Sequence, residues 1–197
     1  MTVLDLLLGR KHVPMIGLDI SSSSAKLVEL GKSSTGEFVL ERLATEPFEK
    51  GWITDGQIEK FEEVVGAVRR LLDKSGSKTR QVVLAMPQSA VITKRINLPA
   101  GLRDEELELQ VESEANQYIP FSLDEVSLDF CVIGPSPTSS GDVEVLIAAS
   151  RKERVQDRQG LAEAAGLKPV VLDIESHAAL LAISRVVDTL PNQGRDA

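Results

Sequence analysis

The sequence predicts a mixed α+β protein built from two small units. Strand-like and helix-like patterns follow one another in the order βββαβ and then βαββα. The 197 residues suit one ordinary domain or two small ones, at roughly 150 residues per domain. A hydrophobic content of 42% and a charged content of 26% are typical of a globular chain and not of a disordered one.

The first unit is predicted to open with three strands in an antiparallel meander. Short stretches of turn-forming residues separate these strands, so neighbouring strands pair through tight connections. The strands are expected at residues 14–20, 25–30 and 38–44, with turns at 21–24 and 31–36.

An amphipathic helix and a buried strand complete this unit. The helix is expected to open at Asp55 or Gly56, because apolar residues recur on one face from Ile58 to Leu72. Acidic residues near its start and basic residues near its end suit the helix dipole. Gly76 ends it, and residues 81–86 form the strand.

The second unit is expected to read strand, helix, strand, strand, helix. Residues 90–98 alternate as a strand, and Asp104 caps a helix that runs to Tyr118 and stops before Pro120. The buried stripe of this helix is predicted to be Leu107, Val111, Ala115 and Tyr118.

The rest of the chain is predicted as a hairpin, a capped helix, a strand and a last helix. Residues 127–134 and 142–149 form the hairpin, and SRKE at 150–153 matches a capping box. That box starts a helix which Gly166 ends. Residues 170–173 form a strand that joins either sheet, and residues 175–189 form the last helix.

The net charge of −8 is concentrated between residues 101 and 130, where nine acidic residues face one basic residue. Such a field repels phosphate backbones, so nucleic acid is not expected as a partner. If Glu105, Glu108 and Glu112 meet a partner, a cationic surface or peptide fits best. The alternative is a solvated helix face.

Several chemistries lack their usual residues. One cysteine, Cys131, excludes an intramolecular disulfide, and it is expected to be a small structural thiol. Two histidines, His12 and His177, leave little room for a histidine metal centre. The phosphate-loop, dinucleotide, zinc-protease and serine-hydrolase motifs are absent, so no catalytic residues are predicted.

Both ends of the chain carry their own expectations. Residues 3–8 are apolar but short, which favours a docking helix or an extra strand, with insertion at a membrane interface as the alternative. We expect a cytoplasmic protein. Residues 191–197 are expected to be a linker or a truncated end.

One turn has a possible binding chemistry. Asp19 ends the first strand, and the hydroxyl-rich turn of Ser21, Ser22, Ser23 and Ser24 follows it. Backbone N–H groups and hydroxyls in such a turn can hold phosphate, while the carboxylate orients a hydrated Mg²⁺. An ordinary serine-rich hairpin is the alternative.

Read together, several segments resemble the PilM family of type IV pilus assembly proteins, over essentially the whole chain. The division protein FtsA is similar in architecture but matches these segments less well. The resemblance is carried by LDLLLG at 4–9, GLDISSSS at 17–24, KLVEL at 26–30, SAVITK at 89–94, LPAGL at 98–102, EANQYIPF at 114–121 and VSLDF at 126–130.

The resemblance implies an actin-like N-terminal subdomain at residues 1–86, with 167–190 packing back on it. An inserted subdomain follows at 87–166. Family members bind ATP with Mg²⁺, and a groove between the two subdomains holds the cytoplasmic N-terminal peptide of the inner-membrane protein PilN. This links PilN to the motor and platform, with a homo-oligomer possible and no catalytic role needed.

The sequence departs from the family in two ways. It stops about where a second actin-like half should begin, and it has serines where many actin-like relatives have glycine in the phosphate turn. ATP binding by this part is therefore expected to be weak or absent. The alternatives to a PilN-binding adaptor are an ATP-binding or phosphotransfer protein and an FtsA-like polymerising scaffold, each needing the second half.

Overall fold

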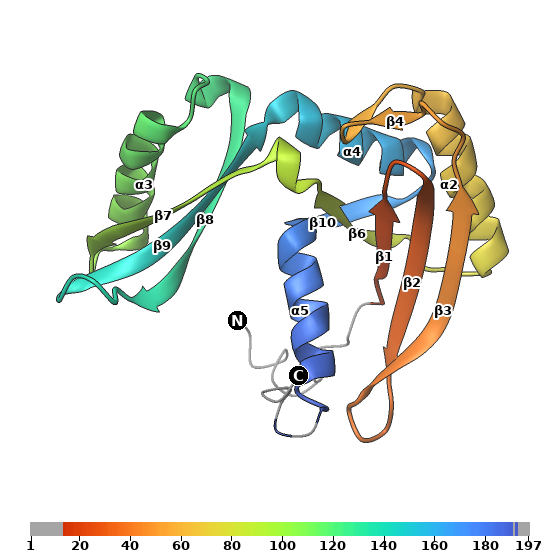
Figure 1. Cartoon of the computed structure of the whole chain (residues 1–197), viewed down its shortest axis with the longest axis horizontal. Coiled ribbons are helices and arrows are strands. Elements are labelled where there is room, and N and C mark those ends of the chain that lie inside the picture. Colours follow the sequence, from red (N-terminus) through yellow and green to blue (C-terminus); the bar gives the residue numbers. More distant parts are fainter. Residues whose placement is uncertain (1–13, 191, 193–197) are drawn as a thin grey trace, which may run out of the picture. The chain divides into compact units, whose positions relative to one another are not determined.

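The computed structural model describes residues 14–190 and residue 192 (Figure 1). The expectations for residues 3–8 and for most of 191–197 concern residues that the structure does not describe. The strands are β1 Ile16–Ile20, β2 Ser24–Lys32, β3 Phe38–Pro47, β4 Ile53–Thr54, β5 Gln57–Ile58, β6 Gln81–Met86, β7 Ile92–Pro99, β8 Val126–Pro135, β9 Asp142–Arg151 and β10 Lys168–Ile174. The α-helices are α2 Phe61–Ser75, α3 Asp104–Tyr118, α4 Lys152–Ala164 and α5 Glu175–Val187, with short 3-10 helices η1 Gln88–Ala90 and η2 Leu123–Glu125.

The described residues form two compact units, which we call the first and the second unit. The first contains residues up to 54 together with 58–84 and 161–172. The second contains 55–57, 85–160 and the residues from 173 onward. Residues 173–190, expected with the first unit, thus group with the second.

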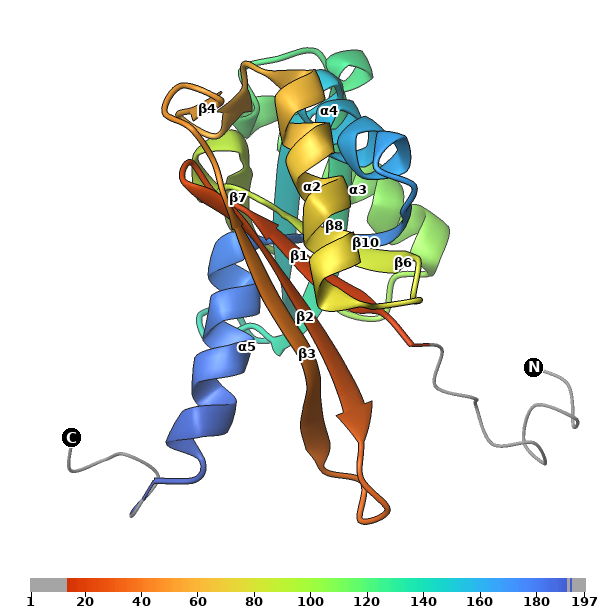
Figure 2. The same cartoon turned by 90° about the vertical axis from the view of Figure 1, so that its right-hand side faces the viewer.

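The first unit is built on a five-stranded sheet of order β10-β6-β1-β2-β3. β1 pairs antiparallel with β2 and parallel with β6, and β2 pairs antiparallel with β3. The predicted meander is therefore confirmed, and β10 joins this sheet at its edge. Helix α2 covers one face of the sheet (Figure 2) and buries Val64, Val68 and Leu71 against Leu27.

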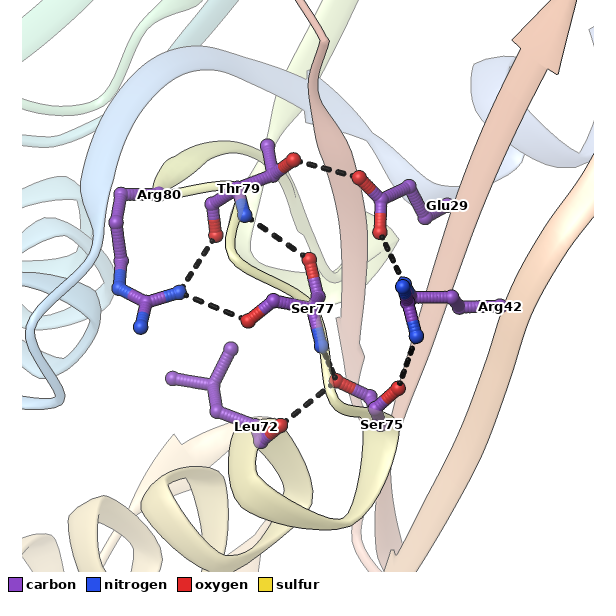
Figure 3. Close-up of polar contacts among 7 residues, drawn as sticks. All are labelled: Glu29, Arg42, Leu72, Ser75, Ser77, Thr79 and Arg80. Carbon is purple, nitrogen blue, oxygen red and sulfur yellow. Dashed lines mark hydrogen bonds and ion pairs between the residues drawn. The ribbon is translucent and has the colours of Figure 1, made fainter.

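A polar network fastens the end of α2 to the sheet (Figure 3). Glu29 on β2 is buried; its carboxylate accepts a hydrogen bond from the Thr79 hydroxyl and lies 3.2 Å from Arg42 Nε as an ion pair. Arg42 also donates to the carbonyl of Ser75, the last residue of α2. A charge is tolerated at this buried position because Oε1 accepts a hydrogen bond and Oε2, which has no hydrogen bond, is still paired with the Arg42 charge.

The start of α2 was predicted wrongly. The helix begins at Phe61, and Asp55 and Gly56 instead form the turn between β4 and β5. Both residues have positive φ, 51° for Asp55 and 76° for Gly56. An Asp-Gly pair is the preferred two-residue hairpin connection, because its twist matches that of the strands. The helical period misled here because Ile58 falls by chance on the helix face.

The second unit is a three-stranded antiparallel sheet of order β7-β9-β8 with α3 packed on it. Val111 and Ala115 are buried against Ile96 and Val145. The helix bounds agree with the prediction, but two details differ. Asp104 is the first helical residue and Arg103 the cap. Tyr118 is 45% exposed and not part of the core, and Lys94 Nζ lies over its ring, 4.6 Å from the ring centroid.

Two further expectations for this unit are wrong. Ser150 does not cap α4; it is part of β9, and its hydroxyl donates to the Ala90 carbonyl at 2.8 Å. The strand continues because Ser150 pairs with Ser127 of β8. Cys131 is exposed, since it lies on the side of β8 turned away from the core. Gly166 ends the α4 segment with φ 86°, as predicted.

Helix α5 has no buried residue, although its sequence is rich in apolar side chains. Leu180, Leu181, Ile183 and Val186 are all at least 59% exposed. None of the described helices is long and apolar enough to span a membrane.

Candidate functional site

The serine turn lies between β1 and β2 and closes on itself. The backbone N–H of Ser21 donates to the Ser24 carbonyl at 3.0 Å, and its hydroxyl donates to the same oxygen at 3.1 Å. The Ser23 carbonyl accepts from the N–H of Phe48. Ser22 and Ser23 are exposed, whereas Ser24 is buried. The turn thus gathers all four predicted serines, but two of its residues already use hydrogen-bonding groups internally.

Asp19 lies beside this turn, and its charge is already paired. Lys26 is its cross-strand partner, and Lys26 Nζ donates to Asp19 Oδ2 at 2.7 Å. Both side chains are 46% exposed, so solvent screens the pair. A hydrated Mg²⁺ at Asp19 would have to displace this lysine. Among the described residues, no three His, Cys, Asp or Glu side chains gather as a metal site.

A pocket of about 460 Å³ lies within the second unit. It is bordered by the end of α3, the start of β8, the end of β9, η1 and the Asp55 turn. Its lining residues are Asp55, Ser89, Ala90, Ile92, Ile119, Pro120, Phe121, Val126, Ala149, Ser150, Arg151 and Arg154. The volume is in the range of sites that hold a small ligand or a few side chains.

The floor of the pocket is apolar and well fixed. Ile119, Val126 and Ala149 are buried members of the core of the second unit. Ile119 is the extended C-cap of α3, Pro120 cannot continue the helix, and Phe121 also borders the pocket. Such a floor favours an aliphatic or aromatic group on the occupant.

The polar rim of the pocket holds two arginines, and each has a partner within the unit. The Arg151 guanidinium lies over the Phe121 ring, 4.1 Å from its centroid. Arg154 donates to Gln57 Oε1 at 3.0 Å. Cation–π and charge-assisted contacts of this kind hold the side chains in place and shape the rim.

The acidic helix α3 presents its charges to solvent. Glu105, Glu108 and Glu112 are exposed, as the sequence predicted, and whether they meet a partner stays a prediction. Glu106 differs from them, because the Arg103 side chain donates to it at 2.8 Å and the Arg103 backbone N–H at 3.1 Å. These hydrogen bonds lower the pKa of Glu106 below its ordinary value of 4.5.

Sequence reasoning missed the pocket. Its lining residues come from five separate stretches, and only the tertiary fold brings them together. One sequence signal could have found part of it, because the pair Asp55–Gly56 is typical of a hairpin turn. The apolar helical period that starts at Ile58 instead favoured a helix there. The segments EANQYIPF and SAVITK, quoted for the resemblance, do supply several lining residues.

Comparison with known families identifies this architecture. The model of the type IV pilus assembly protein PilM family matches residues 17–197. The chain belongs to the PilM family. A solved PilM-PilN type IV pilus biogenesis complex contains a chain that is 32% identical, with a TM-score of 0.77. The match covers 88% of this chain and 51% of that chain, so the chain spans about half the length of this PilM relative.

A second solved structure is more distant. The cytoplasmic domain of EpsL, an inner-membrane component of the type II secretion system of Vibrio cholerae, is 14% identical with a TM-score of 0.50. The match covers 81% of this chain and 57% of that one, and at this identity it shows the fold alone. The mixed α+β, actin-like fold expected from the resemblance is thus the one found.

Proposed function

We propose that this PilM segment binds the cytoplasmic N-terminal peptide of PilN in the pocket of the second unit. In this role it is an adaptor, not an enzyme, and it links PilN at the inner membrane to the motor and platform of the pilus machine. The observation that carries the proposal is the pocket itself, a partly apolar space of about 460 Å³. Its support is the 32% identity to a chain solved as a PilM-PilN complex.

The pocket suits a short peptide segment better than a nucleotide. Its floor of Ile119, Val126 and Ala149, with Ile92 also in the lining, favours an aliphatic side chain. Burial of one such side chain contributes about 1.5–3 kcal/mol. Ser89, which is exposed, supplies a hydroxyl group for hydrogen bonds to the backbone of the peptide. A peptide thus gains both affinity and register from one site.

Nucleotide binding stays a prediction for the first unit. In favour of it, Ser22 and Ser23 are exposed and free to approach a phosphate. Against it, the Asp19 carboxylate is held by Lys26. We propose that ATP with Mg²⁺ binds this segment weakly, and that PilN binding does not require it.

The test is a titration of the protein with a peptide copying the N-terminus of its PilN partner, with and without Mg-ATP. A blocking variant, Ala90→Phe, places a ring in the pocket at a half-buried position. Ala100→Phe adds the same ring at an exposed position outside the pocket and serves as its control. Circular dichroism checks that both variants fold.

We expect saturable binding without nucleotide, at least tenfold weaker in Ala90→Phe and unchanged in Ala100→Phe. An absence of binding by the wild-type protein in both conditions would refute the proposed function. Equal affinity of the two variants would place the peptide elsewhere on the molecule.

A further inference from the structure

We infer that Asp55 is a specificity-determining residue of the pocket, whose carboxylate receives a cationic group of the bound peptide. The inference rests on the proposed function and adds the chemistry of the occupant: an ammonium or guanidinium group beside an aliphatic side chain. The observations that carry it are the fixed backbone of the Asp55 turn and the absence, among the described residues, of a hydrogen bond or ion pair to its exposed carboxylate.

The turn holds Asp55 in one conformation. Asp55 and Gly56 connect β4 to β5 with positive φ at both positions. Aspartate adopts this region more readily than most residues, and a two-residue turn leaves the backbone little freedom. The direction in which the Asp55 side chain leaves the backbone is therefore set before any ligand arrives.

The turn is also clamped from two sides within the second unit. Arg158, only 3% exposed, donates to the Gly56 carbonyl at 3.3 Å, and Arg154 donates to the Gln57 side chain. On another side, a Cβ at Gly56 would lie 2.8 Å from the Pro87 ring. A buried arginine that binds a turn carbonyl is a costly arrangement that rigidifies its neighbours. Arg158 is thus a positioning residue for Asp55.

Among the described residues, Asp55 and Arg151 are the charged residues of the pocket lining whose side chains have no hydrogen bond or ion pair. Arg151 faces Phe121 and Arg154 faces Gln57. No ion pair joins Asp55 to either arginine within the described chain. Arg151 is thus held by a ring and Arg154 by an amide, whereas the exposed Asp55 carboxylate has no contact partner in the described chain and remains for the occupant.

An unpaired carboxylate on a fixed turn next to an apolar floor selects for a cation. A charge-assisted hydrogen bond is stronger than a neutral one, and a preformed acceptor loses little entropy on binding. The cation is expected beside the Asp55–Gly56 turn, although Arg154 and Arg158 bind the neighbouring Gln57 and Gly56. A peptide without a cationic group leaves Asp55 unpaired and partly desolvated, which weakens binding.

The experiment compares Asp55→Asn with Glu105→Gln in the full protein, using the PilN peptide as probe. Asparagine tolerates positive φ and keeps the shape of the side chain, so the turn is retained and the charge is lost. Glu105→Gln removes the same charge from exposed α3, outside the pocket, and controls for the overall field. The peptide is also made with each Lys or Arg replaced by Gln, and with its α-amine acetylated.

We expect Asp55→Asn to weaken binding about tenfold or more, and Glu105→Gln to change it less than twofold. Replacing one particular cation of the peptide should weaken binding to the wild-type protein but not to Asp55→Asn. That cation is then the group that Asp55 binds. If the wild-type protein binds the peptide and Asp55→Asn binds it with the same affinity, the inference is overturned and the proposed function stands. The same holds if no peptide cation is coupled to Asp55. No binding by the wild-type protein would overturn both.

Discussion

Two hairpin turns of this protein use polar residues in opposite ways. The serine turn between β1 and β2 satisfies itself, because Ser21 donates twice to Ser24 and Asp19 pairs with Lys26. The Asp55–Gly56 turn between β4 and β5 is held from outside, by arginines of α4 and by the contact with Pro87. Its own carboxylate is left without a partner among the described residues.

The difference shows why residue type alone does not make a site. Four serines beside an aspartate look richer in binding chemistry than one Asp-Gly pair. Hydrogen-bonding groups that are already engaged must be freed before they bind a ligand, and this costs free energy. A group held in place by its neighbours but left unpaired offers its full interaction.

The largest expected effect tests the clamp on the second turn. Gly56→Ala places a methyl group against Pro87 at a residue with φ 76°. Gly141→Ala, at φ 91° with nothing within 4 Å, carries the strain of positive φ alone. We expect Gly56→Ala to lower the free energy of unfolding by about 2 kcal/mol more than Gly141→Ala, measured by urea denaturation. Equal losses would mean that the turn is not clamped.

The next effect tests the self-satisfied turn. Ser21→Ala removes the hydroxyl that donates to Ser24, and Ser22→Ala removes an exposed hydroxyl without a hydrogen bond in the described chain. We expect a loss of about 1 kcal/mol for Ser21→Ala and no measurable change for Ser22→Ala in the same denaturation experiment. A reversed order would show that the turn is held by other contacts.

A smaller effect is expected from the ion pair between Asp19 and Lys26, which should limit ligand binding more than it stabilises the fold. Lys26→Ala removes an exposed ion pair, so we expect stability to change by less than about 0.5 kcal/mol and less still at high salt. The freed carboxylate should bind Mg-nucleotide more tightly than in the wild-type protein, as followed by calorimetry. Unchanged nucleotide binding would indicate that Lys26 does not limit this turn.

The smallest effect concerns α3, whose glutamates look alike in sequence. Arg103 lowers the pKa of Glu106, so its carboxylate should titrate below the ordinary value of 4.5 in an NMR pH series. Because the pKa is lowered in the folded state, the ionised carboxylate stabilises the fold at any pH above its ordinary pKa. This contribution is lost as the pH falls through the lowered pKa. Arg103→Gln should raise the pKa of Glu106 toward its ordinary value, and an unchanged titration of Glu106 would assign the shift to another cause.

The sequence predicted the fold well where local patterns agree with tertiary packing. The meander and the bounds of α3 followed from alternation and from a helical period whose apolar side chains are buried in the structure. The start of α2 was wrong because turn chemistry at Asp55 overrode a periodic pattern that continued by chance to Ile58. Ser150 was misassigned because strand pairing with β8 overrode a local capping signal.

The candidate site was harder to predict for a physical reason. The predicted turn is continuous in sequence, so its residues could be named in advance. The pocket needs Asp55, Phe121 and Arg154 to meet, and these lie far apart along the chain. No local sequence pattern predicts that these residues lie together, because contacts such as the hydrogen bond from Arg154 to Gln57 exist only in the folded state.

The most direct test of the account is a photo-cross-link between the bound PilN peptide and the protein. A peptide carrying a photoreactive aliphatic side chain is irradiated in the complex, and the modified residues are mapped by mass spectrometry. The account predicts adducts on Ile92, Phe121 and other residues that line the pocket. These adducts should be lost in Ala90→Phe and kept in Ala100→Phe. Adducts on the serine turn or on the exposed face of α3, with the pocket unmodified, would contradict it.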